Sequence, residues 1–106
     1  MATTNATQEN FESLIKNNEI VLVDFWAEWC GPCKKFSPIF EASSEKHTDV
    51  QFAKVDTEAE HSLAAGANIQ SIPTILAIKN GRLVFSHSGV ISGKQIDNLI
   101  EQVKAL

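Results

Sequence analysis

Short apolar runs alternate with polar turn residues along the chain, and the spacing inside each run predicts its secondary structure. Residues 20–26 are rich in β-branched and aromatic side chains and have the length of a buried strand. Before them, helical spacing predicts a helix over about residues 8–16. Its buried face consists of Phe11, Leu14 and Ile15. Residues 1–6 are polar and Thr-rich, so we expect a short edge strand there at most.

One long helix is predicted next, from the Gly31-Pro32 turn towards His47. Pro38 falls inside this helix, where its missing N–H and the clash of its ring favour a kink. The buried side is marked by Phe36, Ile39 and Phe40. We therefore expect one bent helix rather than two.

The second half of the chain predicts a strand, a short helix and then a hairpin. Residues 50–56 form the strand and residues 58–65 the helix, so the crossover from the strand 20–26 should be right-handed and parallel. Residues 74–79 and 82–87 flank Asn80-Gly81, a strong signal for an antiparallel hairpin with a type I′ turn.

A cap and an apolar stripe predict the closing helix. Residues 92–95 (Ser-Gly-Lys-Gln) have the form of a capping box. The stripe that follows consists of Ile96, Leu99, Ile100 and Val103. Together the elements predict an α/β fold in which a mixed central sheet of four or five strands carries about four helices on its two faces.

Length and composition fit one domain over residues 1–106. Apolar residues make up 43% and charged residues 21%, which argues against disorder or a coiled coil. Thirteen acidic against nine basic residues give a formal charge of -4, so no nucleic-acid binding is expected. The apolar run 20–23 is far shorter than the ~20 residues of a membrane span, and the polar start lacks a signal-peptide region. We therefore expect a cytoplasmic protein without membrane association.

The two cysteines are the most informative feature, because they lie three positions apart as Cys30-Gly31-Pro32-Cys33. Disulfide reduction requires an ionised, exposed thiol that attacks and a second thiol close enough to resolve the mixed disulfide. A Cys-x-x-Cys pair at a helix start supplies both, with Cys33 one turn after Cys30 on the same face. Gly31 permits the tight turn, and Pro32 suits the first helical turn, where its missing N–H is not needed.

Other interpretations of the cysteine pair are weaker. A structural disulfide is uncommon in a cytosolic chain, and a buried thiol pair is a further alternative. A metal site would need two more ligands, which His47, His61 and His87 do not offer at zinc-finger spacing. We therefore favour redox chemistry and expect no bound metal.

Ionisation of Cys30 does not by itself make a fast reductase. A helix N-terminus favours the anion by about 0.3–1 kcal/mol, or up to ~2 kcal/mol when the site is partly buried. Even the larger value raises reactivity only about threefold, because a more stable thiolate is a weaker nucleophile. We expect the remaining rate to come from a docking surface that orients the target disulfide and from the high effective concentration of Cys33.

Asp24 interrupts the apolar run 20–26 at a position where a carboxylate should be buried, and burial raises the pKa of a carboxyl group. If its side chain points towards the helix start, it can accept the proton of Cys33 during resolution. Two plainer interpretations stay open, namely a polar residue at the end of the sheet and a pairing with Lys54.

Motifs along most of the chain carry a family resemblance. Residues 23–34 read Val-Asp-Phe-Trp-Ala-Glu-Trp-Cys-Gly-Pro-Cys-Lys. They are followed by Pro38, 54–56 (Lys-Val-Asp), 71–74 (Ser-Ile-Pro-Thr), 79–81 (Lys-Asn-Gly) and Gly89. From about Phe11 onward the chain resembles the thioredoxin family, and the block 23–34 is highly specific. The resemblance implies the thioredoxin fold, a three-layer α/β/α arrangement, in a single thioredoxin domain.

The resemblance also implies roles around the cysteines. Cys30 corresponds to the attacking cysteine and Cys33 to the resolving one, while Asp24 corresponds to the buried acid that serves their proton transfers, tuned by Lys54. Trp29 is similar to the tryptophan that shields the site. Trp26 is similar to the one packed beneath it, and we expect packing to be its main role.

A substrate groove beside the cysteines is implied as well. Pro73 matches the family's cis-proline; without an N–H it should leave the adjacent carbonyl and the Ile72 backbone free to pair with an extended client. Ser71, Ile72, Gly89 and Val90 match positions that border the groove, where an apolar lip accepts varied proteins. A plain turn proline and a strand-end glycine are the alternatives.

The function implied by the resemblance is thiol-disulfide oxidoreduction. A monomer would reduce protein disulfides with its own Cys30-Cys33 dithiol, need no bound cofactor, and be reduced again by a thioredoxin reductase, most simply an NADPH-linked one. Two rivals differ from this interpretation. One is a binding module that uses the groove beside Pro73 without redox chemistry, and the other is an oxidase or isomerase, against which the Gly-Pro pair between the cysteines argues.

Overall fold

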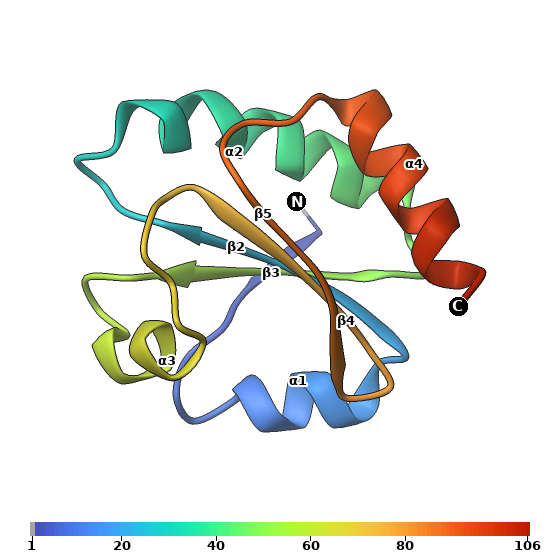
Figure 1. Cartoon of the computed structure of the whole chain (residues 1–106), viewed down its shortest axis with the longest axis horizontal. Coiled ribbons are helices and arrows are strands. Elements are labelled where there is room, and N and C mark those ends of the chain that lie inside the picture. Colours follow the sequence, from blue (N-terminus) through green and yellow to red (C-terminus); the bar gives the residue numbers. More distant parts are fainter. Residues whose placement is uncertain (1) are drawn as a thin grey trace.

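The protein is described by a computed structural model that covers residues 2–106. Its elements are β1 (Thr3–Asn5), α1 (Phe11–Asn17), β2 (Ile20–Trp26), α2 (Gly31–Lys46), β3 (Gln51–Asp56), α3 (His61–Gly66), β4 (Thr74–Lys79), β5 (Arg82–Ser88) and α4 (Gly93–Lys104). The sheet lies between α2 and α4 on one face and α1 and α3 on the other (Figure 1). The predicted mixed α/β fold in three layers is confirmed.

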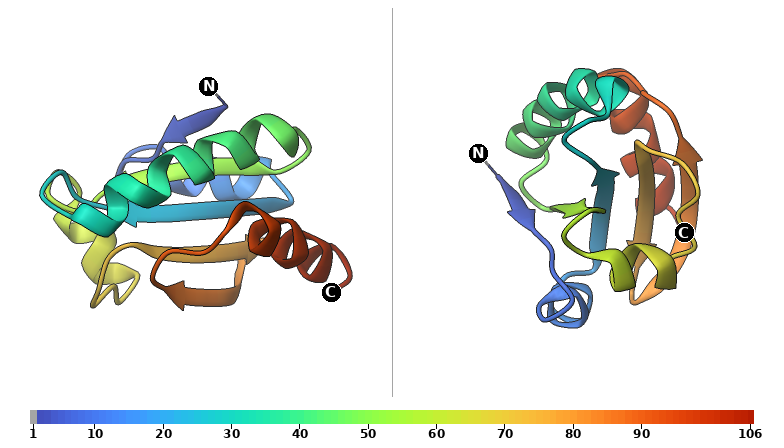
Figure 2. Two further views of the ribbon diagram at one scale, coloured as in Figure 1. Left: turned by 90° about the horizontal axis from the view of Figure 1, so that it is seen from above. Right: turned by 90° about the vertical axis from the view of Figure 1, so that its left-hand side faces the viewer.

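The sheet has five strands in the order β1-β3-β2-β4-β5. Strands β1 and β2 run parallel to β3, whereas β4 runs antiparallel to both β2 and β5. The edge position of β1 confirms the short edge strand expected in residues 1–6, of which Met1 lies outside the described residues. Figure 2 shows the twisted sheet from above and along its strands. Asn80 and Gly81 both have positive φ, 51° and 80°, as the predicted type I′ turn requires.

Two helices begin later than the apolar pattern predicts, because side chains hold the preceding residues in turns. Helix α1 begins at Phe11 instead of residue 8, since Asn10 Oδ1 accepts a hydrogen bond from the Thr7 N–H at 2.7 Å. Helix α3 begins at His61 instead of residue 58, since Asp56 Oδ1 accepts the Glu58 N–H at 2.9 Å. The Asp56 contact is an Asx turn, whereas Thr7 and Asn10 bind each other's N–H groups reciprocally, since Thr7 Oγ1 accepts the Asn10 N–H.

The two longest helices follow the sequence closely. Helix α2 is continuous from Gly31 to Lys46 with Pro38 inside it, which confirms one helix rather than two. Helix α4 has the predicted capping box, in which Ser92 Oγ accepts the Gln95 N–H and the Gln95 side chain accepts the Ser92 N–H. None of the helices formed by residues 2–106 is long and apolar enough to cross a membrane.

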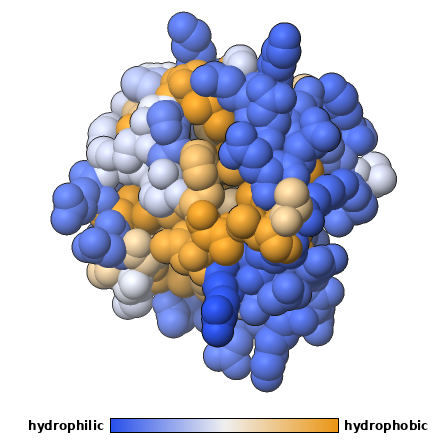
Figure 3. Space-filling view, turned by 45° about the vertical axis from the view of Figure 1, so that its right-hand side comes forward, coloured by the Kyte–Doolittle hydropathy of each residue, from blue (hydrophilic) through white to orange (hydrophobic). Residues whose placement is uncertain are grey.

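Apolar side chains form one core on each face of the sheet. The larger core lies beneath α2 and α4 and includes Phe36, Phe40, Phe52, Ile96 and Ile100, while the other lies beneath α1 and α3 and includes Val23, Phe25 and Val55. Strand β5 is different, because most of its side chains are exposed, including Leu83 and Val84. Figure 3 shows apolar side chains gathered in a band across the side of the molecule where β5 and α4 lie.

Candidate active site

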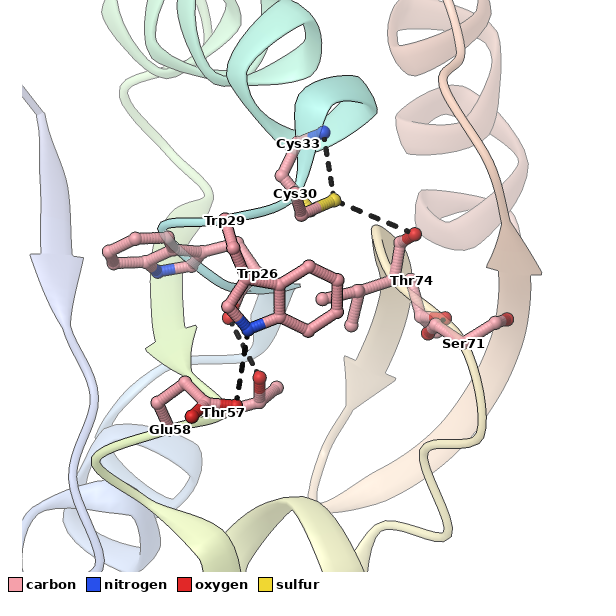
Figure 4. The surroundings of a disulfide bond; sticks show 9 residues. Trp26, Trp29, Cys30, Cys33, Thr57, Glu58, Ser71 and Thr74 are labelled. Atoms are coloured by element: carbon pink, nitrogen blue, oxygen red, sulfur yellow. Dashed lines mark hydrogen bonds between the residues drawn. A yellow bond between two sulfur atoms is a disulfide. The ribbon is translucent and has the colours of Figure 1, made fainter.

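The two cysteines lie at the start of α2, directly after strand β2 and a short connection. Cys30 is the N-cap residue of the helix, and its side chain forms a disulfide with Cys33. The Cα atoms of the pair are 5.2 Å apart. Figure 4 shows both cysteines facing the turn that carries Ser71 and Thr74. The predicted strand-to-helix placement of the pair is confirmed.

A main-chain N–H at the start of α2 forms a hydrogen bond with Cys30 Sγ. The N–H of Cys33 points at Cys30 Sγ with a donor-to-acceptor distance of 3.2 Å. In the reduced protein this first-turn N–H, which has no intrahelical partner, would stabilise a thiolate at the same position. Cys30 is less accessible than predicted for an attacking thiol, since only 4% of it is exposed in the disulfide form. Cys33 is 3% exposed. The low exposure means that a client must approach the sulfur by a defined path.

Gly31 and Pro32 occupy the first turn of α2, and both are exposed. Pro32 lies where its missing N–H is not needed, as predicted. Gly31, which was expected to permit the tight turn, does not have a positive φ, and a Cβ there would meet no atom within 4 Å. The absence of a side chain instead keeps the surface beside the disulfide open.

Asp24 lies in the middle of β2 and is completely buried. Neither carboxyl oxygen has a hydrogen-bond partner among residues 2–106. Burial raises the pKa of Asp24 from 3.8 to about 7, and the positive charge of Lys54 acts weakly in the opposite direction. The predicted burial is confirmed. Lys54 acts on Asp24 through its charge, with no hydrogen bond between the two side chains, and Asp24 is the fifth of the seven residues of β2. A carboxyl group with this pKa can take up and release a proton near neutral pH.

Lys54 lies beside Asp24 in the sheet, because the two residues are register partners in β3 and β2. Its ammonium group donates to Ser37 Oγ at 2.7 Å and lies 5.3 Å from the centre of the Trp26 ring. The ring of Trp26 packs on the cluster that contains both cysteines. Trp26 Nε1 is buried without a partner in the described part of the chain. A cavity of about 240 Å³ extends from the side chains of Lys54 and Trp26 to Cys33. It is lined by Trp26, Ala27, Glu28, Cys33, Lys34, Ser37 and Lys54.

Trp29 lies at the surface beside the disulfide, with 69% of the residue exposed. Its Nε1 donates to Glu58 Oε2 at 3.3 Å (Figure 4). The hydrogen bond holds the ring over a groove of about 350 Å³, which is lined by Trp29, Thr57, Ala64, Ile69, Gln70, Ser71 and Ile72. Sequence reasoning missed Glu58, because only the folded chain brings the turn after β3 next to the loop before α2.

The Ile72-Pro73 peptide bond is cis, as the resemblance implies. Cys30 Sγ lies 3.8 Å from the main-chain oxygen of Ile72. A disulfide sulfur has no hydrogen, so this distance becomes a possible S–H···O bond only in the reduced protein. The carbonyl of Pro73 itself is engaged, because it accepts the Gly89 N–H at 2.8 Å. For Ile72, no backbone hydrogen bond to residues 2–106 is found beyond this contact.

The other predicted groove residues surround the same turn. Gly89 has φ +107°, a conformation that favours glycine, and its N–H holds the cis-proline turn. Val90 follows it and is 36% exposed, which supplies an apolar lip. Ser71 lines the groove beside Trp29. The structure therefore groups the predicted groove residues around the cis-proline turn beside Cys30, whereas Asp24 lies inside strand β2.

No group of three or more His, Cys, Asp or Glu side chains that could hold a metal ion occurs within residues 2–106. Two of the three histidines are engaged elsewhere. His47 is bound to Asp97 in α4 at 2.6 Å, and His87 stacks on Phe85 in β5.

Comparisons with known proteins agree with this geometry. The thioredoxin family profile matches residues 2–103. This chain is a member of the thioredoxin family. It is 43% identical to the Streptomyces coelicolor protein named putative thioredoxin 2, over 99% of the chain and 78% of that protein. It is 40% identical to the solved thioredoxin of Plasmodium falciparum, with a TM-score of 0.86 over 93% of this chain and 97% of that one. A solved mutant thioredoxin from Halobacterium salinarum gives a TM-score of 0.89 at 29% identity, over 95% and 89% of the two chains.

Membership of the family and the Cys30-Cys33 disulfide make the protein a thiol-disulfide oxidoreductase. Thioredoxins as a family exchange electrons with disulfide substrates and with a reductase. The redox-active group present in this chain is the disulfide itself. The predicted family, fold and reaction type are thus confirmed.

Proposed function

We propose that this chain acts as a single thioredoxin domain that reduces protein disulfides, with Cys30 as the attacking and Cys33 as the resolving cysteine. The observation that carries the assignment is the Cys33 N–H directed at Cys30 Sγ. The cap stabilises negative charge on Cys30 but offers nothing comparable to Cys33.

The reaction transfers two electrons to the client. The Cys30 thiolate attacks one client sulfur, which forms a mixed disulfide and releases the other client sulfur as a thiolate. Cys33 then gives its proton to Asp24 and attacks Cys30 Sγ, so that the Cys30-Cys33 bond forms and the client bond breaks. Asp24 then returns the proton to the departing client sulfur. The first client thiolate takes up the proton that Cys30 released to water when it ionised, so client disulfide and protein dithiol become client dithiol and protein disulfide.

Binding of the client uses the groove around the cis-proline turn. The unpaired backbone of Ile72 lies next to Cys30 and can bond to an extended segment, in the manner of an added strand. Trp29, Gly31 and Val90 provide exposed surface around this path, and Pro32 stiffens it. Gly89 and Pro73 hold the turn in place through their main-chain hydrogen bond. Lys54 and Trp26 form the surroundings of Asp24, because Lys54 is its register partner and Trp26 lies two residues further along β2.

The cellular setting of the proposal follows from the reaction. The protein disulfide is reduced again by an NADPH-linked thioredoxin reductase, so no bound cofactor is needed besides the Cys30-Cys33 pair. The protein works as a cytoplasmic monomer that maintains cell redox homeostasis, because it requires a reducing pool and a site open to many clients.

Reduction of insulin disulfides, coupled to NADPH and thioredoxin reductase, tests the proposal. The Cys30→Ser variant should lose all measurable activity, because the remaining thiol, Cys33, is only 3% exposed and lacks the main-chain cap that Cys30 has. The Cys33→Ser variant should accumulate a covalent mixed disulfide with insulin that mass spectrometry detects. A Cys30→Ser protein that reduces insulin at the rate of the unmodified protein would contradict the assignment of roles.

The direction of electron flow has its own test. Equilibration against glutathione buffers, followed by thiol labelling, gives the reduction potential of the pair. A reductase requires a potential at or below the cytosolic glutathione range of about -220 to -320 mV. A potential far above that range would indicate an oxidase or isomerase instead.

A further inference from the structure

Three hydroxyl groups beside the cis-proline turn are linked by hydrogen bonds into a ring that closes through the main chain of Ser71. Ser71 Oγ donates to Ser88 Oγ at 2.9 Å, and Thr74 Oγ1 donates to the main-chain oxygen of Ser71 at 2.6 Å. Ser88 Oγ and Thr74 Oγ1 are 3.2 Å apart. Since the single hydroxyl proton of Thr74 is already given to Ser71, Ser88 must be the donor of this third bond. The ring therefore consumes all three hydroxyl protons.

The ring leaves acceptors at the surface but no donor. A hydroxyl oxygen can accept two hydrogen bonds. Within residues 2–106, no hydrogen bond enters Ser71 Oγ, and only the bond from Ser71 enters Ser88 Oγ. Both serines are exposed, whereas Thr74 is buried. A molecule that meets this surface therefore finds the lone pairs of two serine oxygens and no free O–H.

The position of the ring relates it to the bound client. Ser71 directly precedes Ile72, whose main-chain oxygen is 3.8 Å from Cys30 Sγ, and it also lines the groove beside Trp29. Ser88 is the register partner of Thr74 and directly precedes Gly89. Figure 4 shows Ser71 and Thr74 on the turn that faces the cysteines. The acceptors thus lie next to the residue that would pair with the client backbone.

We propose that Ser71 and Ser88 are specificity-determining residues that favour protein disulfides with a Lys or Arg next to the reacting cysteine, on the side that enters the groove. The inference rests on the proposed function and names its substrate class. A cationic donor forms a charge-assisted hydrogen bond with the free serine lone pairs. A client carboxylate meets only other acceptors there, and Glu58, which holds Trp29 at the same groove, adds like charge.

Two peptide disulfides that differ only in this flanking residue, Lys or Glu, test the preference. We expect kcat/KM to be about three- to tenfold higher for the Lys peptide, the effect of one hydrogen bond at an exposed site. Measurement in 0.5 M NaCl reduces the contribution of the overall charge of -4.

Serine variants separate the ring from general electrostatics, because they change no charge. Ser88→Ala removes the acceptor of the Ser71 proton, so Ser71 becomes a free donor and the Lys/Glu ratio should fall about threefold or more. Ser71→Ala removes the hydroxyl oxygen of Ser71, one of the two free acceptors, and should also lower the Lys/Glu ratio of kcat/KM. Ser86→Ala is the matched control, since Ser86 is exposed on the same strand and makes no side-chain hydrogen bond to residues 2–106. Its ratio should equal that of the unmodified protein.

Equal kcat/KM for the two peptides, or the same ratio in the Ser88→Ala and Ser86→Ala proteins, would overturn the inference. A small aromatic disulfide without peptide flanks distinguishes this failure from that of the proposed function. If the unmodified protein reduces the aromatic disulfide but shows no Lys/Glu bias, only the specificity is wrong. If it reduces no disulfide, the proposed function is wrong and the inference falls with it.

Discussion

Two charged residues are buried in neighbouring central strands, and their surroundings are opposite. Lys79, at the end of β4, donates to the main-chain oxygens of Val103 at 3.0 Å, Lys104 at 3.2 Å and Leu106 at 2.6 Å. Asp24, in the middle of β2, has no hydrogen-bond partner among residues 2–106. Their register partners, Ile20 and Ile75, both belong to the core beneath α2 and α4, so the two charges lie on the same face of the sheet at separate positions along the strands.

The difference separates a structural charge from a chemical one. The ammonium group of Lys79 satisfies the end of α4, where main-chain oxygens have no intrahelical donor. A carboxyl group without partners contributes no such bond and costs stability when it ionises. That cost is consistent with a proton carrier, because the same burial that destabilises the anion moves the pKa of Asp24 to about 7.

The largest effect is expected from Asp24→Asn on stability. In the unfolded chain the carboxyl ionises near pH 3.8, but in the folded protein it stays protonated up to about pH 7. The penalty is therefore absent below pH 3.8, grows between these values and is complete above pH 7, where it is on the order of 4 kcal/mol. We expect Asp24→Asn to raise the free energy of unfolding by about 2–4 kcal/mol at pH 8, with the gain shrinking towards pH 4. Urea unfolding at several pH values measures it, and a pH-independent difference would contradict the raised pKa.

The second largest effect is expected from Asp24→Asn on the rate at which the mixed disulfide is resolved. Without the Asp24 carboxyl, Cys33 must lose its proton to water, and we expect resolution of the mixed disulfide to slow about 100-fold at pH 7. Rapid-quench measurement of client release gives this rate, and its inflection near pH 7 should disappear. Alkylation of Cys30 in the reduced protein serves as the control, because it reports the attacking thiol alone. Normal resolution with a normal pH profile would leave Asp24 without the proposed role.

The smallest effect is expected at Lys79. Replacement by Met removes the three hydrogen bonds, but part of the freed helix end can reach water, since Lys104 and Leu106 are exposed. We expect Lys79→Met to lower the free energy of unfolding by about 1–3 kcal/mol and to leave insulin reduction unchanged. Lys35→Met, at an exposed position of α2, is the matched control and should change stability by less than about 0.5 kcal/mol. Equal stability of the two variants would mean that the Lys79 contacts do not support the fold.

Periodicity predicted the elements well where the apolar pattern is long, and poorly where a polar side chain competes for the backbone. Strand β2 and helix α4 agree with their apolar runs, since burial of a continuous face determines both. The starts of α1 and α3 are wrong by three residues, because Asn10 and Asp56 bind nearby N–H groups. These side-chain bonds do not follow from hydrophobic spacing.

At the candidate site as well, features that depend on residues adjacent in the chain were predicted, and features that depend on distant residues were not. The spacing of Cys30 and Cys33 was enough to predict the helix cap and the chemistry, because an N-cap and its first turn are adjacent in the chain. Gly31, which was expected to permit the tight turn, adopts an ordinary backbone conformation as the first residue of α2. The engagement of the Pro73 carbonyl by Gly89 was not foreseen, since these residues are separated by a whole hairpin.

What the amino-acid sequence by itself determined is therefore local: the order of strands and helices, the type I′ turn at Asn80-Gly81 and the redox pair at a helix start. Tertiary structure alone decided which polar groups find partners. Lys79 receives three acceptors from the end of α4 and the residues after it, more than twenty residues away. Asp24 receives none, and Ser71, Ser88 and Thr74 form a ring. The physical reason is that periodicity and turn chemistry act between near neighbours, whereas hydrogen-bond saturation and burial depend on residues that meet only when the sheet and its helices are packed.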